Sequence, residues 1–174
     1  MSFDRTGNLL GALALVTTDR TAEAASGAAG RSHSAAAALS WMHQFDQSPS
    51  VETLRRVLGL TSSGTVRLVD SLVADGYARR GAGPDARTTS VSLTAAGHRT
   101  ATKVAKARGS VLEEALGSLS DAERQALEEL HSKLLVSLIR GPDATRWMCR
   151  MCDTGVCRAD AGCPVTNVIR TRQA

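Results

Sequence analysis

The chain has 174 residues, of which 43% are hydrophobic and 3% are aromatic. This length supports one domain with an appendage and argues against a multidomain enzyme, and the scarcity of aromatic residues favours a core of Ala, Leu and Val between helices. The net charge of +4 is modest, but between Val51 and Arg99 seven Arg stand against four acidic residues. Such a local excess is typical of a surface that contacts phosphates.

The first part of the chain predicts two helices. A long helix with a broad apolar face is expected at about residues 5–26, and a second between residues 34 and 45 has apolar residues at helical spacing. The longest uncharged stretch here, residues 6–18, is too short to span a bilayer and does not form a convincing signal peptide. We therefore expect a cytoplasmic protein with no membrane partner.

The next two segments predict a helix-turn-helix. Ser50 is a candidate N-cap with Glu52 in the first turn, and Gly59 ends this helix. Thr61 caps the following helix, which turns its apolar residues inward and closes at Gly76. Its other side is expected to carry Ser62, Ser63, Thr65 and Arg67.

A hairpin and two more helices complete the predicted pattern. Residues 77–80 and 88–93 alternate as short strands do, and the segment between them is rich in turn residues. Thr94 caps a long helix, and Ser120 with Glu123 forms a capping box for the last one. The sequence therefore predicts a mainly α fold with a small β wing.

Several short motifs follow one another between Val51 and Arg99: Leu58-Gly-Leu-Thr61, Val69-Asp-Ser-Leu72, Asp75-Gly76, Arg79-Arg80 and Leu93-Thr-Ala-Ala-Gly97. Their order and spacing resemble those of the MarR family of winged helix-turn-helix transcriptional regulators. Asp85 and Arg87 match the Asp-x-Arg of the family's wing. The resemblance covers roughly residues 5–140.

The resemblance implies a domain organisation and partners. Residues 1–140 would form a MarR-like winged-helix domain, with its DNA-binding part at about 34–94 and dimerisation helices at about 5–26 and 95–140. Residues 141–174 would be a separate cysteine-rich segment. The partners implied are a second copy of the chain and double-stranded DNA carrying an inverted-repeat operator.

The expected DNA contacts lie on the second helix of the helix-turn-helix and on the wing. Small hydroxyl side chains permit close approach to the major groove, and arginines reach phosphates, base edges or the minor groove. Asp70 is expected to make a structural bond rather than to contact the negatively charged DNA. The predicted contacts are Thr61, Ser62, Ser63, Thr65, Arg67, Arg79, Arg80 and Arg87.

All four cysteines lie in the C-terminal segment with the spacing C-x2-C-x4-C-x5-C: Cys149, Cys152, Cys157 and Cys163. In a reducing compartment this clustering favours a shared metal or cluster site over disulfides. Structural zinc usually takes two cysteine pairs that lie far apart in the sequence, whereas one compact loop suits a larger inorganic core. Cys163-Pro164 also resembles the Cys-Pro of bacterial ferredoxins, although the other spacings depart from that pattern.

We therefore expect an iron–sulfur cluster, with Zn²⁺ as the alternative. Arg146, Arg150 and Arg158 lie in the same segment and would offset the charge of the thiolates under either choice. Because the segment follows the last dimerisation helix, we expect its state to change the angle between subunits.

The predicted function is a dimeric transcriptional regulator whose cluster senses redox, nitric oxide or iron status. One alternative is a MarR-type repressor that answers a small phenolic or hydrophobic ligand and uses zinc structurally. An alternative of another class is a cluster-containing electron-transfer or redox protein. Nothing indicates catalysis, because there is no Gly-rich phosphate loop and no histidine is spaced from a carboxylate or nucleophile as a catalytic site requires.

Overall fold

The computed structural model describes residues 4–83, 88–141, 143–157 and 162–173. Over these residues the chain is mainly helical with one two-stranded antiparallel sheet, which confirms the predicted fold class. The elements are α1 (Arg5–Ala29), α2 (His33–Gln44), α3 (Val51–Leu58), α4 (Ser62–Ala74), β1 (Ala78–Ala82), β2 (Thr89–Leu93), α5 (Ala95–Leu116), α6 (Asp121–Ser137), α7 (Ala144–Met148), α8 (Thr154–Cys157) and α9 (Pro164–Gln173).

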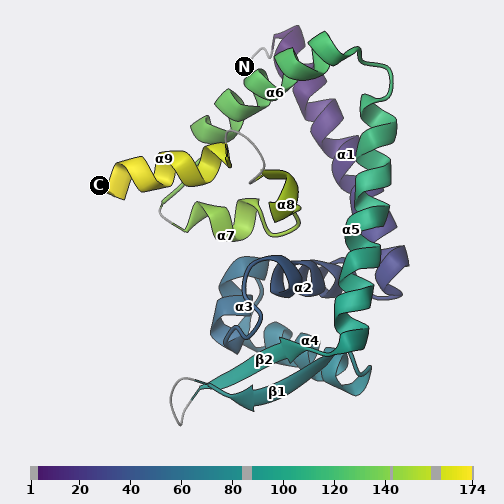
Figure 1. Cartoon of the computed structure of the whole chain (residues 1–174), viewed down its shortest axis with the longest axis vertical. Helices are drawn as coiled ribbons and strands as arrows, with labels where there is room; N and C mark the ends of the chain where they lie inside the picture. The colour runs from purple at the N-terminus through teal and green to yellow at the C-terminus, as the bar shows by residue number, and fades with distance from the viewer. Residues whose placement is uncertain (1–3, 84–87, 142, 158–161, 174) are drawn as a thin grey trace.

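The long helix α5 connects the two ends of the molecule (Figure 1). At the lower end, α2, α3, α4 and the two strands form the winged-helix part. At the upper end, α1 packs along α5, and α6 follows after a tight turn. The C-terminal helices lie between these ends, with α9 against α6 and α7 against α3.

Capping side chains explain where the helices begin. Ser50, Thr61 and Thr94 each accept a hydrogen bond from a backbone N–H three residues later, at 3.0, 3.1 and 3.1 Å. Ser120 and Glu123 form the predicted capping box of α6. These bonds satisfy N–H groups that have no partner within the helix, so the starts of α3 to α6 follow from local sequence.

The turn after α4, the sheet and the start of α5 form one tightly packed unit. Gly76 has a φ of 72°, a left-handed conformation that glycine adopts readily. The Thr94 hydroxyl donates to the carbonyl oxygen of Gly76 at 2.7 Å. A Cβ atom at Gly97 would lie 2.1 Å from the carbonyl oxygen of Tyr77, so only glycine fits there without movement.

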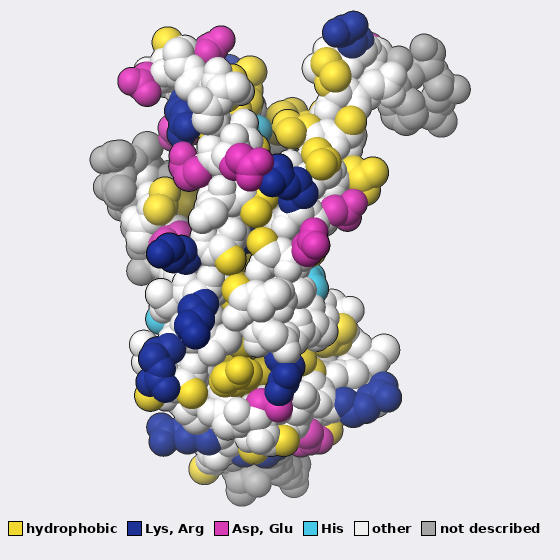
Figure 2. Space-filling model, turned by 90° about the vertical axis from the view of Figure 1, so that its right-hand side faces the viewer, with side chains coloured by type: hydrophobic (Ala, Val, Ile, Leu, Met, Phe, Trp, Pro, Cys, Tyr) yellow, Lys and Arg dark blue, Asp and Glu magenta, His cyan; other side chains and the backbone are white. Residues whose placement is uncertain are grey.

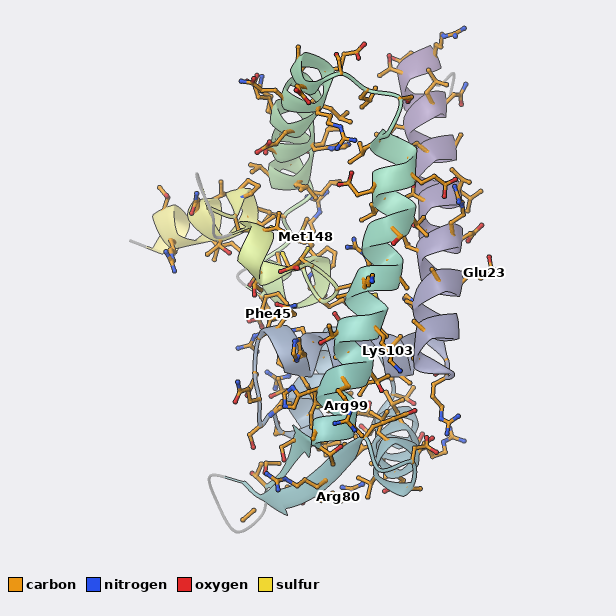
Figure 3. All side chains as sticks on the ribbon, turned by 45° about the vertical axis from the view of Figure 1, so that its right-hand side comes forward. Glu23, Phe45, Arg80, Arg99, Lys103 and Met148 are labelled. Carbon is orange, nitrogen blue, oxygen red and sulfur yellow. The ribbon has the colours of Figure 1, made fainter. Side chains whose placement is uncertain are left out.

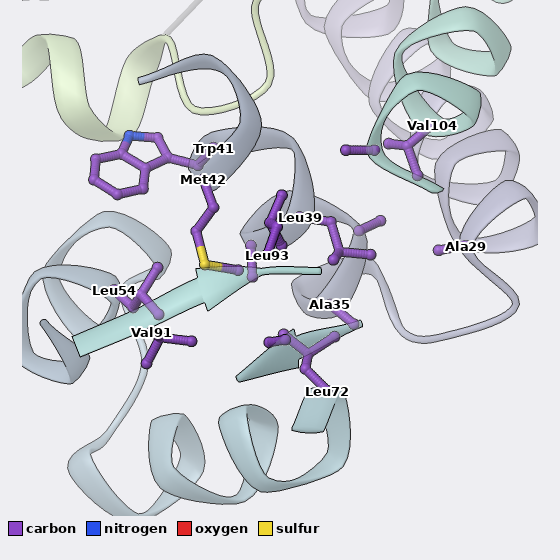
Figure 4. Close-up of a cluster of buried hydrophobic side chains, with 14 of the residues drawn as sticks. Ala29, Ala35, Leu39, Trp41, Met42, Leu54, Leu72, Val91, Leu93 and Val104 are labelled. Atoms are coloured by element: carbon purple, nitrogen blue, oxygen red, sulfur yellow. The ribbon is translucent and has the colours of Figure 1, made fainter. Parts of the chain in front are cut away.

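The main apolar core fills the winged-helix part, with α2 at its centre (Figure 4). Leu39 and Met42 of α2 are fully buried, together with Leu54 of α3, Leu72 of α4 and Val91 of β2. A second, smaller cluster of buried residues lies in the C-terminal segment and at the end of α6: Ile139, Ala144, Cys149, Val165 and Ile169. The C-terminal segment is therefore folded around apolar contacts of its own.

Helices α1 and α6 leave much apolar surface uncovered. No residue of α6 is buried. The exposed apolar side chains of the two helices include Leu9, Leu10, Leu13, Leu15, Val16, Leu130, Leu134 and Leu135. None of the helices in the described ranges is long and apolar enough to cross a membrane.

Several local expectations differ from the structure. Helix α1 runs to Ala29 rather than to about residue 26, and α6 ends at Ser137 rather than near residue 140. The strands span 78–82 and 89–93, so they are shifted slightly from the predicted 77–80 and 88–93. Cys157 is the last residue of the short helix α8, and the other three cysteines lie in the connections beside α7, α8 and α9 rather than on one loop. Apolar side chains of α7 and α9 pack together in the second cluster, and this tertiary packing stabilises helices too short to form alone.

Candidate DNA interface and cysteine cavity

The N-terminal end of α4 presents a small polar surface. Three of the predicted residues are exposed there: Thr61, Ser62 and Ser63. The prediction that Thr65 shares this surface is wrong, because Thr65 is fully buried and its hydroxyl donates to the Thr61 carbonyl at 2.9 Å. Thr65 lies one turn before the buried Val69 and so faces the core, whereas Val66, expected inward, is 43% exposed.

The arginines of α4 and β1 lie exposed beside this surface. Arg67 donates to the backbone of α4 at 3.4 Å, and Arg79 donates to the Ser92 hydroxyl at 3.1 Å. Arg80 pairs with Asp70 at 2.6 Å, which confirms the structural bond expected of Asp70. An exposed ion pair adds little stability, but this one holds the wing beside α4.

The predicted wing-tip contact, Arg87, lies outside the described residues. Figure 2 shows many Lys and Arg side chains on the lower half of its face, and Arg99 lies near the start of α5 (Figure 3). Arg55 and Arg56 are less available to DNA, because both bond Glu52 and lower the pKa of its carboxyl to about 2. The positive charge available to DNA therefore lies mainly on α4, the wing and α5.

All four cysteines line one cavity of about 230 Å³. Cys149 follows α7, and Cys152 donates its backbone N–H to the Cys149 carbonyl at 2.8 Å in the next turn. Cys157 ends α8, and Cys163 precedes α9. Pro164 occupies the first position of α9, where its missing N–H costs nothing, so the Cys-Pro pair also has a role in starting this helix.

The cysteine side chains influence one another's protonation. The Cys149 thiol hydrogen-bonds the Cys152 sulfur, which raises the pKa of Cys149 and lowers the pKa of Cys152 to about 6. Burial, with a smaller effect from the charges of Cys152 and Cys163, raises the pKa of Cys157. The four sulfurs therefore form one interacting donor set.

Three residues near the cysteines were not predicted from the sequence. Arg108 of α5 lies close enough to Cys152 to favour its thiolate, after the hydrogen bond from Cys149. Phe45, at the end of α2, and Arg170 of α9 line the cavity. Figure 3 shows Phe45 at the junction between the winged-helix part and the C-terminal segment.

The two described arginines that were expected to balance the thiolates bond other groups instead. Arg146 pairs with Asp143 at 3.5 Å, and Arg150 donates to the Trp147 carbonyl. Arg158 lies outside the described residues. Among the described residues, no group of three or more His, Cys, Asp or Glu side chains is already arranged to hold a metal ion.

The helix pair α3 and α4, followed by the two-stranded wing, defines a winged helix-turn-helix protein. Residues 29–88 match the sequence model of the MarR family, which confirms the resemblance over the winged-helix part. No curated relative matches the sequence significantly.

Solved structures share this fold. The apo form of wild-type MarR from Escherichia coli aligns with a TM-score of 0.65 at 21% identity, covering 78% of this chain and 99% of that one. RV1404 from Mycobacterium tuberculosis aligns with a TM-score of 0.69 at 20% identity, covering 80% of this chain and 97% of that one. MepR, a transcription regulator of the Staphylococcus aureus multidrug efflux pump MepA, aligns with a TM-score of 0.67 at 14% identity, covering 79% of this chain and 100% of that one. At these identities the likeness establishes the MarR winged-helix fold.

Proposed function

We propose that the protein is a homodimeric DNA-binding transcriptional regulator whose four cysteines hold an iron–sulfur cluster, through which it senses redox, nitric oxide or iron status. The DNA-binding function is supported by the exposed polar end of α4 and the arginines around it. One observation carries the cofactor: all four cysteines of the chain line a single cavity.

The major groove of DNA admits one helix, and α4 has the properties of a reading helix. Ser62 and Ser63 are small enough for close approach, and Arg67 lies one turn further along the exposed side. Arg79 and Arg80 of β1, with Arg87 as predicted from the sequence, are proposed to contact phosphates and the minor groove. The buried Thr65 is not part of this surface.

A second copy of the chain is the proposed partner of α1 and α6. Several exposed leucines occur on each of these two helices, rather than one apolar side chain here and there. Exposed apolar surface that is clustered in this way favours association with another protein surface. A two-fold axis would pair two α4 helices with half-sites about one helical turn apart on an inverted repeat.

The cysteine site suits a cluster better than a single zinc ion. A tetrahedral zinc site needs its sulfurs at about 2.3 Å from one point. Here all four cysteines line one cavity of about 230 Å³, which leaves space for a larger inorganic core. The four thiolates would hold the cluster, Arg108 would offset negative charge, and the cluster would supply reversible redox chemistry.

Anaerobic purification followed by iron, sulfide and zinc analysis tests the cofactor, and we expect brown protein containing iron and sulfide. Operator binding is then compared for loaded protein, cluster-free protein and Cys152→Ala, with folding followed in parallel. Equal binding by all three folded forms would exclude sensing. Colourless zinc protein that unfolds on metal loss would favour the repressor with a structural zinc site. A cluster protein without DNA binding would favour electron transfer.

A further inference from the structure

We infer that the C-terminal segment reports the state of the cysteine cavity to the winged-helix part of its own protomer through α2, with Gln44 as the positioning residue. This inference rests on the proposed cluster site and assigns the route by which that site acts on DNA binding. The segment Cys149 to Thr154 is called the docking segment below.

The docking segment lies along α2. At the end of α2, the Thr154 backbone N–H and hydroxyl both donate to the Gln44 side-chain oxygen, at 3.3 and 2.7 Å. Met151 of the docking segment packs against the main apolar core. Near the first turn of α2, burial and the nearby charge of Arg150 lower the pKa of His33. Figure 1 shows α7 and α8 next to α2.

The contact with Gln44 is joined directly to the cysteine site. Thr154 lies between two of the cysteines, Cys152 and Cys157, and itself lines the cavity. Phe45, the residue after Gln44, lines the same cavity. A group bound by Cys152 and Cys157 would fix the position of α8 and keep both donors on Gln44. Loss of that group would release them.

Helix α2 contacts three other elements of the winged-helix part. It packs against α3, α4 and β2, and its Leu39 and Met42 are fully buried in the core that includes Leu72 of α4. Just before α2, Arg31 donates to Asp75 at the end of α4 at 2.6 Å. Because packed interiors leave little free space, a displaced α2 shifts the elements packed against it.

This route differs from the one expected from the sequence. A segment attached only to α6 would act through the angle between subunits, and α9 does pack against α6. The docking segment adds a shorter route within one protomer, and only this route depends on the Gln44 oxygen.

The test uses full-length Gln44→Met, which removes the acceptor while keeping the length of the side chain. Gln47→Met is the matched control, because Gln47 is exposed in the loop after α2. Thr154→Val, with Thr154→Ser as its conservative partner, tests the contact from the other side. Each variant is purified anaerobically, and its iron and sulfide contents are measured. Affinity is measured with and without cluster on a duplex selected from a random pool by the loaded wild-type protein. Amide hydrogen exchange follows α2 and Thr154.

In wild type and Gln47→Met we expect loaded and cluster-free protein to differ in affinity by about 5- to 150-fold, the usual range of such coupling. In Gln44→Met the iron content should be normal, exchange at Thr154 faster, and the affinity ratio close to one. Gln44→Met and Thr154→Val could instead keep the wild-type ratio of loaded to cluster-free affinity although amide exchange at Thr154 is faster. That result would overturn the route through α2 while leaving the proposed cluster sensor intact. Equal affinities of loaded and cluster-free wild type would instead reject sensing itself, and the route with it.

Discussion

Gly97 illustrates how a single residue fixes the position of α5 on the wing. A Cβ there would lie 2.1 Å from the Tyr77 carbonyl oxygen, so Gly97→Ala should destabilise the protein by about 1–3 kcal/mol. Gly109 lies on the same helix with nothing within 4 Å of an added Cβ. Gly109→Ala should therefore stabilise by about 0.4–1 kcal/mol. Urea unfolding of both variants measures the contrast, and equal shifts of the same sign would contradict it.

The Asp70–Arg80 pair places a negative charge beside the proposed DNA surface. Asp70→Asn should strengthen DNA binding because it removes this charge and frees Arg80. Arg80→Ala should weaken binding and reduce the salt slope by about one. Fluorescence anisotropy at several salt concentrations measures both changes. Asp19→Asn, on the exposed surface of α1, is the control and should leave affinity nearly unchanged; a similar gain there would indicate a general charge effect.

Some residue assignments could be made from sequence and others could not. The gathering of the four cysteines at one place and the bond of Asp70 could be predicted from spacing and charge alone. The exposures predicted for Thr65 and Val66 were the reverse of those in the structure. Adjacent residues of a helix point about 100° apart, so placing the buried face one position too far along the sequence is enough to reverse the two exposures. Pairing of Gln44 with Thr154, 110 positions apart, has no local signal, because it depends on how the C-terminal segment folds back over α2.

At the scale of elements, the Arg31–Asp75 bond ties the start of α2 to the end of α4. The hydrogen bond from Arg31 holds the pKa of Asp75 below its ordinary value of 3.8. The folded carboxyl therefore binds protons less readily, and its contribution to stability is complete above pH 3.8 and is lost as pH falls through the lowered pKa. Wild type should be more stable than Asp75→Asn at neutral pH, and this advantage should shrink in acid.

Thermal unfolding of the two proteins from about pH 7 to below pH 3 measures this difference. Arg31→Gln should behave like Asp75→Asn, since each variant removes one partner of the same bond. A difference that stays constant as pH falls would show that Asp75 acts through packing rather than through its charge.

The starts of α3 to α6 were predictable because their signals are local: the capping hydroxyls act within a few residues of the helix ends they define. The end of α6 was not, because it ends at Ser137 rather than near residue 140. Helix α9 has a local start signal in Pro164, but the sequence analysis did not predict α7 or α9, because both are stabilised mainly by the apolar cluster they share with the end of α6. Local chemistry thus predicted the winged-helix part, and tertiary packing decides the C-terminal part.

At the scale of the whole molecule, the uncovered apolar surface of α1 and α6 leads to a prediction on assembly. Leu13 of α1 and Leu134 of α6 are 49% and 43% exposed. If these helices pack against a second copy, Leu13→Glu and Leu134→Glu would place charges in an apolar interface. Each change should shift the protein from dimer to monomer, because an unpaired buried charge is strongly unfavourable. Sedimentation velocity across a concentration series measures the shift.

Val66→Glu is the matched control for this prediction, because Val66 has a similar exposure of 43% but lies on α4. This variant should remain dimeric, yet it should lose DNA affinity because a carboxylate would face the phosphates. Leu13→Glu and Leu134→Glu should also lose affinity, but through loss of the paired half-site contacts that a dimer provides. Dimers of unchanged stability in both leucine variants would place the subunit interface elsewhere. Dissociation by Val66→Glu would instead place α4 in the interface and remove it from the DNA surface.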